Sequence, residues 1–173
     1  CRIPTAVLRD NPKWIIGYSD ISALHSAQLC AGNMSLHANM NGALATGGAH
    51  GTLNLMLRDA LTGNLKGYTI PGHKYNRPGT ASGILIGGNM YVLSQIAGSR
   101  EYDCLDRDNI EGKDIILFIE DVGENFERVN SMLCRLYLNG VLQHIKGLVL
   151  GRFTDYKPRW VYKDMSDTIH DTL

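Results

Sequence analysis

Ser19 stands at the tip of a predicted strand-to-helix turn. Within residues 13–25, written KWIIGYSDISALH, a short apolar run passes through Gly17 to Ser19, and a helical pattern follows. In hydrolases a turn of this kind exposes a nucleophilic serine hydroxyl, and the backbone N–H of the next residue, here Asp20, can donate to an oxyanion. The usual GxSxG pattern is only half present, because Ile21 replaces the second glycine. Ser19 also suits a helix N-cap, so the turn alone allows both a catalytic and a structural role.

An acidic pair, Glu120 and Asp121, directly follows the apolar residues 114–119, DIILFI. Sites in open α/β sheets collect at the carboxyl ends of strands, where a carboxylate can orient a catalytic histidine. The alternative is that the pair caps the next helix. The sequence Gly87-Gly88-Asn89 also follows a predicted strand, and it indicates either anion binding by backbone N–H groups or close strand–helix packing.

No base for Ser19 is evident among the six histidines. They are His25, His37, His50, His73, His144 and His170. His25 lies too far along the helix to reach the Ser19 hydroxyl, whereas His37 and His50 flank one loop and could line a pocket. No pair has the spacing of a metal site, and no two cysteines form a CxxC motif. We therefore expect neither metal nor cofactor, and we expect Cys30 and Cys134 to be buried free thiols.

The composition is that of a globular protein. The chain has 173 residues, 44% of them hydrophobic, and 17 basic residues balance 17 acidic ones. No basic excess indicates nucleic acid or an anionic membrane surface as a partner, and no apolar run approaches the length of a membrane span. The cysteine pattern fits a reducing compartment, and we expect no signal peptide. The first residue is not methionine and both ends look cut, so we expect an internal fragment.

Hydrophobic periodicity predicts alternating strands and helices. The expected strands are residues 14–18, 35–40, 65–70, 84–86, 114–119 and 145–150. The expected helices are residues 21–29, 52–61, 90–97 and 126–138, and loops are expected at 41–50 and 71–83. This order predicts an α/β fold with mostly parallel strands, in which strand 114–119 is covered on both faces.

Three segments resemble one known family. KWIIGYSDISALH, GTASGILIGGN and the stretch beginning DIILFIEDVGENFERVN occur in the same order as in the LD-carboxypeptidases, serine peptidase family S66. The resemblance implies that residues 1–62 end a flavodoxin-like N-terminal domain and that residues 63–173 form most of a second α/β domain. It also implies that Ser19 is the nucleophile, that Glu120 is the triad glutamate and that the Asp20 N–H belongs to the oxyanion hole.

The activity implied by the resemblance is release of the terminal D-alanine from murein tetrapeptide, during cytoplasmic wall recycling, by a cofactor-free enzyme that is a possible homodimer. The catalytic histidine of the family lies in a Gly-His motif expected beyond Leu173, so we expect the chain alone to be inactive. Two alternatives remain. One is the branch of the family that cleaves a peptidyl-nucleotide antibiotic, and the other, if the chain is complete, is a non-catalytic peptide-binding module.

Overall fold

The computed structural model describes residues 3–48 and 50–173. The helices are α1 (Thr5–Asp10), α2 (Ser22–Cys30), α3 (Asn41–Gly47), α4 (Thr52–Leu61), α5 (Met90–Ile96), α6 (Arg107–Ile110), α7 (Phe126–Leu138), α8 (Val141–His144) and α9 (Met165–Thr172), with a short 3-10 helix, η1 (Ser19–Ile21), before α2. The strands are β1 (Ile16–Gly17), β2 (Leu36–His37), β3 (Ile84–Asn89), β4 (Ile115–Val122) and β5 (Gly147–Thr154). None of these helices is long and apolar enough to cross a membrane.

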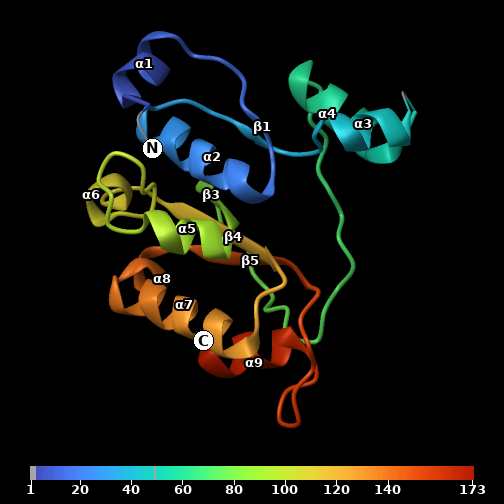
Figure 1. Ribbon diagram of the computed structural model, residues 1–173, viewed down its shortest axis with the longest axis vertical. Helices are drawn as coiled ribbons and strands as arrows, with labels where there is room; N and C mark the ends of the chain where they lie inside the picture. Colours follow the sequence, from blue (N-terminus) through green and yellow to red (C-terminus); the bar gives the residue numbers. More distant parts are fainter. Residues whose placement is uncertain (1–2, 49) are drawn as a thin grey trace.

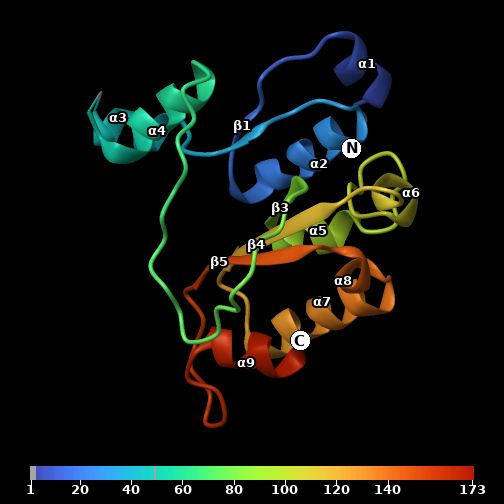
Figure 2. The same cartoon turned by 180° about the vertical axis from the view of Figure 1, so that it is seen from behind.

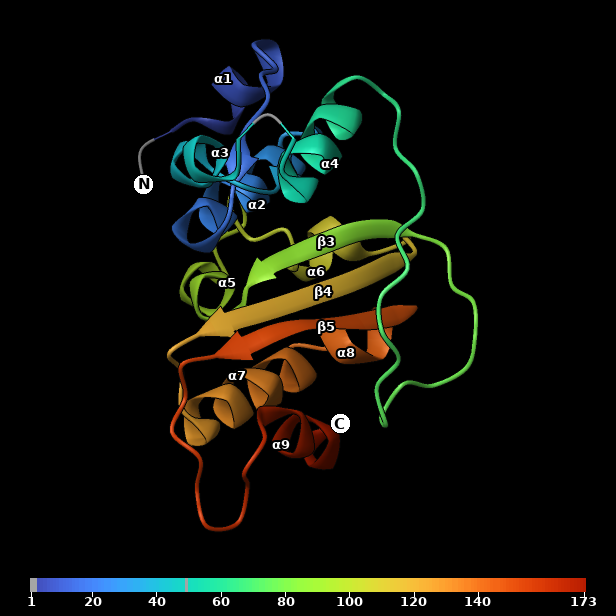
Figure 3. The ribbon, with the colours of Figure 1, turned by 90° about the vertical axis from the view of Figure 1, so that its right-hand side faces the viewer.

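Strands β3, β4 and β5 form one parallel sheet with β4 in the centre (Figure 3). Strands β1 and β2 form a second, two-stranded parallel sheet. Parallel strands need crossover connections, and α5 and α7 provide them between the three strands of the larger sheet. The predicted α/β fold with parallel strands is therefore confirmed.

Burial alternates along the central strand. Ile115, Leu117 and Ile119 are fully inaccessible and face the core, whereas Ile116 and Phe118 are half-buried on the opposite face. Such alternation is expected when one face of a sheet is covered more than the other. The prediction that both faces of this strand are covered is therefore wrong for the part of the chain that the structure describes.

Helices α5, α7 and α9 supply the other side of the core. Helix α5 packs on β3, β4 and α7, and α9 packs on α7, so the helices lie together beside one face of the sheet (Figure 1). The α7 helix begins at the N-cap Asn125, whose side chain accepts a hydrogen bond from the Arg128 N–H at 2.9 Å. Its residues Val129 and Leu133 are fully buried against the sheet.

Several local predictions need correction. Helices 52–61 and 126–138 are confirmed, but residues 41–47 form α3 where a loop was expected, because alanine and leucine outweigh the flanking glycines. Residues 65–70 form no strand, since no described strand lies beside them to complete the backbone hydrogen bonds. Cys134 is exposed instead of buried, and Cys30 is half-buried.

A connecting segment, residues 62–83, joins α4 to β3 without regular secondary structure. It runs along the molecule from α4 to α9 and then back to β3 (Figures 1 and 2). At its turning point the Lys74 Nζ and the Tyr75 hydroxyl both contact Asp167 Oδ1, at 2.6 and 2.7 Å, and the Tyr75 ring stacks on His170. This clasp fixes the middle of the segment to α9.

Gly87 allows β3 and β4 to approach each other, which gives a prediction for stability. Its φ is +152°, and a Cβ at this position would lie 1.7 Å from the Phe118 carbonyl oxygen. Gly87→Ala is therefore expected to destabilise the protein by about 4 kcal/mol or more, because backbone must move. Thermal denaturation measures the loss.

Gly147 offers a matched control in the same sheet. A Cβ there would meet the Ala81 Cβ at 3.7 Å, which is an ordinary contact. Gly147→Ala is expected to change stability by less than about 1 kcal/mol. Equal melting temperatures for the two variants would contradict the close approach of β3 and β4.

Candidate active site

Ser19 lies in a strained turn between β1 and α2. Its φ is +59°, in the left-handed region that a residue with a side chain adopts only when the surrounding structure holds it there. The side chain is exposed, and its hydroxyl makes no hydrogen bond within the described residues. The N-cap of η1 is Tyr18 and that of α2 is Ile21, neither with a side-chain cap. The N-cap role that the sequence allowed for Ser19 is therefore not observed.

The turn is held by its neighbours. A Cβ on Gly17 would lie 2.7 Å from Ile21 Cγ1, so Ile21 packs directly over Gly17 and takes the place of the second glycine of the usual pattern. His25 bonds through Nε2 to the Gly17 carbonyl oxygen at 3.0 Å. Because a carbonyl only accepts, His25 carries its proton on Nε2. Burial lowers the pKa of His25, and the bond to Gly17 offsets part of that effect.

The Asp20 N–H is available at the start of this helical turn. It makes no hydrogen bond to any described residue, whereas the next N–H, of Ile21, donates to the Tyr18 carbonyl oxygen at 3.2 Å. A free N–H beside an exposed hydroxyl at a helix start is the arrangement that stabilises an oxyanion.

Glu120 and Asp121 point to opposite faces of β4, as consecutive strand residues must. Asp121 is buried on the helix side and accepts hydrogen bonds from the Tyr91 N–H at 2.8 Å and from the Asn89 side chain at 3.2 Å. Asp121 therefore caps α5. The expectation that the acidic pair caps the next helix is therefore wrong, because Asp121 caps the preceding helix and Asn125 caps α7.

Glu120 carries a carboxylate oxygen with no partner. Its Oε1 is buried and makes no hydrogen bond within the described residues. Burial raises the pKa of Glu120, the charge of Asp121 raises it further, and the Asn89 side chain offsets part of the rise. Burying a carboxylate oxygen without a hydrogen-bond donor costs folding free energy. The Glu120 carboxylate at this strand end is therefore suited to accept a hydrogen bond from another side chain.

The structure brings the Ser19 turn and Glu120 to the same edge of the sheet. Helices η1 and α2 pack against β3, and the last residue of β3, Asn89, is paired with Glu120 in the strand register. The Asn89 N–H donates to the Ser22 hydroxyl at 2.9 Å. Sequence reasoning missed Ser22, and its sequence signal is a serine at the first position of an apolar helix. No hydrogen bond joins Ser19 to Glu120 within the described residues.

The glycine pair before Asn89 serves packing instead of anion binding. The Asn89 N–H is taken by Ser22, and the Tyr91 N–H is taken by Asp121. The Asn89 side chain caps α5 by accepting from the Val92 N–H at 3.0 Å. Three of the N–H groups at the start of α5, those of Asn89, Tyr91 and Val92, are therefore already bonded within the protein.

The remaining histidines do not provide a base in this arrangement. His37 packs edge-on against Phe118 with ring centroids 5.2 Å apart, and its pKa is lowered by burial and then by His25. No histidine is hydrogen-bonded to Ser19 or Glu120 within the described chain, and neither His37 nor His50 lines the cavities described next. Residues 3–48 and 50–173 contain no cluster of three or more metal-binding side chains.

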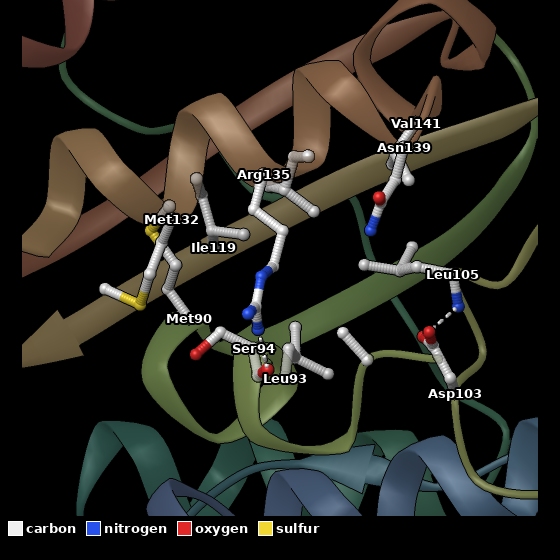
Figure 4. Close-up of a pocket in the computed structure, with 12 residues that line it drawn as sticks. Met90, Leu93, Ser94, Asp103, Leu105, Ile119, Met132, Arg135, Asn139 and Val141 are labelled. Atoms are coloured by element: carbon white, nitrogen blue, oxygen red, sulfur yellow. Dashed lines mark hydrogen bonds between the residues drawn. The ribbon is translucent and has the colours of Figure 1, made fainter. Parts of the chain in front are cut away.

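Two cavities lie away from the Ser19 edge. One has a volume of about 30 Å³, room for about two water molecules, and lies between α5, α7 and the helix-covered face of β4, where Arg135 donates to the Ser94 carbonyl oxygen (Figure 4). The other, of about 320 Å³, lies beside α8 and is lined by Arg107, Gly140 and His144 among others. Neither contains Ser19 or Glu120, so neither is the site that these residues form.

Two stretches of the chain match models of known protein families. Residues 1–38 match the LD-carboxypeptidase N-terminal domain, and residues 82–173 match the LD-carboxypeptidase C-terminal domain. A probable murein peptide carboxypeptidase from Bacillus subtilis is 27% identical over 160 residues, which cover 90% of this chain and 48% of the relative. The chain thus spans about half the length of the curated relatives that it matches.

Two solved structures share the fold over almost the whole chain. The muramoyltetrapeptide carboxypeptidase from Oxalobacter formigenes superimposes with a TM-score of 0.75 at 26% identity, covering 97% of this chain and 56% of the other. The microcin C7 self-immunity protein MccF, in complex with aspartyl sulfamoyl adenosine, gives a TM-score of 0.73 at 22% identity, covering 99% of this chain and 58% of the other.

Proposed function

Because the chain belongs to the LD-carboxypeptidase family, we propose that the protein containing it is a serine hydrolase that releases terminal D-alanine from murein tetrapeptide. The single observation that carries the proposal is Ser19, which has a positive φ and a free hydroxyl at the start of a helix. The named murein relatives support the choice of substrate. We place the boundary between the two domains near residue 62.

The proposed reaction is acyl transfer to Ser19 followed by hydrolysis. The Ser19 oxygen attacks the carbonyl carbon of the L-D amide bond, and a histidine accepts the hydroxyl proton. The Asp20 N–H donates to the oxyanion that forms. The same histidine then protonates the leaving amine of D-alanine, and water completes hydrolysis of the acyl-enzyme.

Glu120 has a supporting role in this scheme. Its unpartnered Oε1 accepts a hydrogen bond from the second ring nitrogen of the histidine. This bond fixes the orientation and the tautomer of the ring. We assign the base to the Gly-His segment typical of the family and not to a histidine of this chain. His25 is not placed as the base, because its Nε2 is bonded to the Gly17 carbonyl oxygen and its Nδ1 is buried and makes no hydrogen bond to Ser19 within the described residues. By itself, the 173-residue chain is expected to have little or no hydrolase activity.

A second candidate function is cleavage of a peptidyl-nucleotide. The fold similarity to MccF favours it, and so do the tryptophan side chains, because Trp14 is 52% exposed and Trp160 is 96% exposed. Exposed aromatic rings can stack on nucleobases, although neither tryptophan lines a described cavity.

Competing substrates distinguish these functions in the complete protein. We expect D-alanine release from murein tetrapeptide, unaffected by Trp160→Ala, and slower or no cleavage of aspartyl sulfamoyl adenosine or a cleavable peptidyl-adenylate. Preferential cleavage of the nucleotide, with loss of that activity in Trp160→Ala, would support the second candidate. Tight binding of the tetrapeptide without turnover would instead support a non-catalytic binding module.

We also propose that the protein is cytoplasmic, because the proposed role is in wall recycling, and that it forms a homodimer, as the family resemblance implies. Cell fractionation tests the first statement, and light scattering coupled to size-exclusion chromatography tests the second.

A further inference from the structure

Two buried serines on α2 bind the part of the chain that carries Glu120. Ser22 and Ser26 are four residues apart, so they lie one turn apart on the same face of the helix. Both are almost completely inaccessible, at 0% and 1% exposure. A buried hydroxyl needs a hydrogen-bond partner, and each of these serines finds its partner in the backbone of the segment from β3 to α6.

The two serines bond to different places. The Ser22 oxygen accepts a hydrogen bond from the Asn89 N–H, at the end of β3, at 2.9 Å. The Ser26 hydroxyl donates to the Tyr102 carbonyl oxygen and accepts from the Cys104 N–H at 2.9 Å, in the loop between α5 and α6. Ser26 therefore makes the larger number of hydrogen bonds, but its partners lie away from the end of β3.

Ser22 lies between the Ser19 turn and the strand residue that pairs with Glu120. The 3-10 helix that begins at Ser19 leads directly into Ser22, three residues later, without an intervening loop. On the other side, Asn89 pairs with Glu120 across the sheet. The hydrogen bond from the Asn89 N–H to the Ser22 hydroxyl thus connects the Ser19 turn with the pair of strands, β3 and β4, that holds Glu120.

The shape of β3 at this point supports the same contact independently. Gly88 has a φ of +144°, and a Cβ there would lie 2.6 Å from the Ser22 oxygen. The absence of a side chain at residue 88 therefore allows Ser22 to approach the strand. His37 Nδ1 is 3.8 Å from the same point, so the helix, the second sheet and β3 converge there.

We propose that Ser22 is a positioning residue that fixes the Ser19 turn relative to Glu120 through the Asn89 N–H. Ser26 holds the same helix to the protein without setting this separation. The proposal rests on the proposed function, since it takes Ser19 and Glu120 as partners in catalysis. Rate is sensitive to placement, because a shift of about 1 Å in a reacting group can lower it about 100-fold.

The test compares Ser22→Ala with Ser26→Ala in the complete protein. Alanine is a good helix former, so both variants should fold, each with a lower melting temperature because buried groups lose partners. Ser22→Ala is expected to lower kcat for murein tetrapeptide about 10- to 100-fold with little change in KM. Ser26→Ala, which loses more hydrogen bonds, is expected to keep kcat within about threefold.

Ser19→Ala in the same assay separates the two proposals. If Ser19→Ala is inactive while Ser22→Ala and Ser26→Ala have equal kcat values, the positioning role is wrong and the proposed function stands. If Ser19→Ala keeps its turnover, the proposed function is wrong, and the positioning role fails with it. Gly88→Ala provides a second variant, because it displaces the Ser22 hydroxyl without removing it and should also lower kcat more than KM changes.

Discussion

Replacing Ser19 by alanine is expected to lower kcat for D-alanine release by about 10⁴- to 10⁶-fold, with the protein still folded. The reason is that the reaction loses its nucleophile, and in other serine hydrolases the remaining binding and oxyanion contacts supply only residual catalysis. The hydroxyl makes no hydrogen bond within the described chain, so its removal leaves no buried group without a partner. Turnover of murein tetrapeptide by the complete protein measures the effect, and circular dichroism checks the fold.

Ser19→Gly is the matched control for the strained turn. It removes the same hydroxyl but also removes the Cβ that makes a φ of +59° unfavourable. We therefore expect Ser19→Gly to be as inactive as Ser19→Ala and more stable by about 1 kcal/mol. Retained turnover in either variant would exclude Ser19 as the nucleophile, and equal stability of the two would argue against backbone strain at this position.

Replacing Glu120 by glutamine is expected to lower kcat by about 10²- to 10⁴-fold. Glutamine has nearly the same shape, but it does not stabilise a positively charged imidazole ring as a carboxylate does. Glu124→Gln is the control, because Glu124 lies in the same acidic stretch but its carboxylate already pairs with Arg128 at 3.1 Å. That variant should keep its kcat within about twofold, since a carboxylate held by Arg128 is not available to orient the histidine. Equal loss in both variants would contradict the assignment of Glu120.

Glu120→Gln should also stabilise the protein at neutral pH. Because burial raises the pKa of Glu120 in the folded state, the folded protein binds its proton more tightly than the unfolded chain does. The stability gained from this tighter proton binding is fully present below the usual glutamate pKa of about 4.3. It is lost as the pH rises through the raised pKa of Glu120 in the folded state. Glu120→Gln should therefore melt at a higher temperature than the wild type at pH 7 and show no such advantage near pH 4. An unchanged difference across this range would contradict the raised pKa.

The local sequence was enough to predict the elements that carry the site. The apolar run before Ser19 and the pattern after it placed the hydroxyl at a strand-to-helix turn, and residues 114–119 placed Glu120 at a strand end. The different environments of Glu120 and Asp121 also follow from strand alternation, although the sequence cannot say which face the helices cover. These features depend on neighbours within a few residues, which is why pattern reasoning reaches them.

The contacts between the two halves of the chain were not predictable in the same way. Ser22 and Asn89 are 67 residues apart in the sequence, and the residues around each of them do not indicate that the two form a hydrogen bond. The positive φ of Ser19 is likewise imposed by packing around the turn, because serine by itself does not favour that conformation. The aromatic side chains of Trp14 and Tyr137 are more than half exposed, and their positions in an apolar strand or helix pattern do not reveal how far the core extends.

The clasp between the connecting segment and α9 has a consequence for how the chain tolerates being cut or lengthened. Residues 62–83 contribute no side chain to the hydrophobic core and no strand to the sheets, and Lys74 and Tyr75 anchor them at one point. The contacts of α2 with β3 and α5 do not depend on this segment. Insertions or a proteolytic nick between α4 and Lys74 therefore leave both the anchor and the Ser22 contact in place, which makes this stretch the natural site for a fusion tag or for two separately expressed halves.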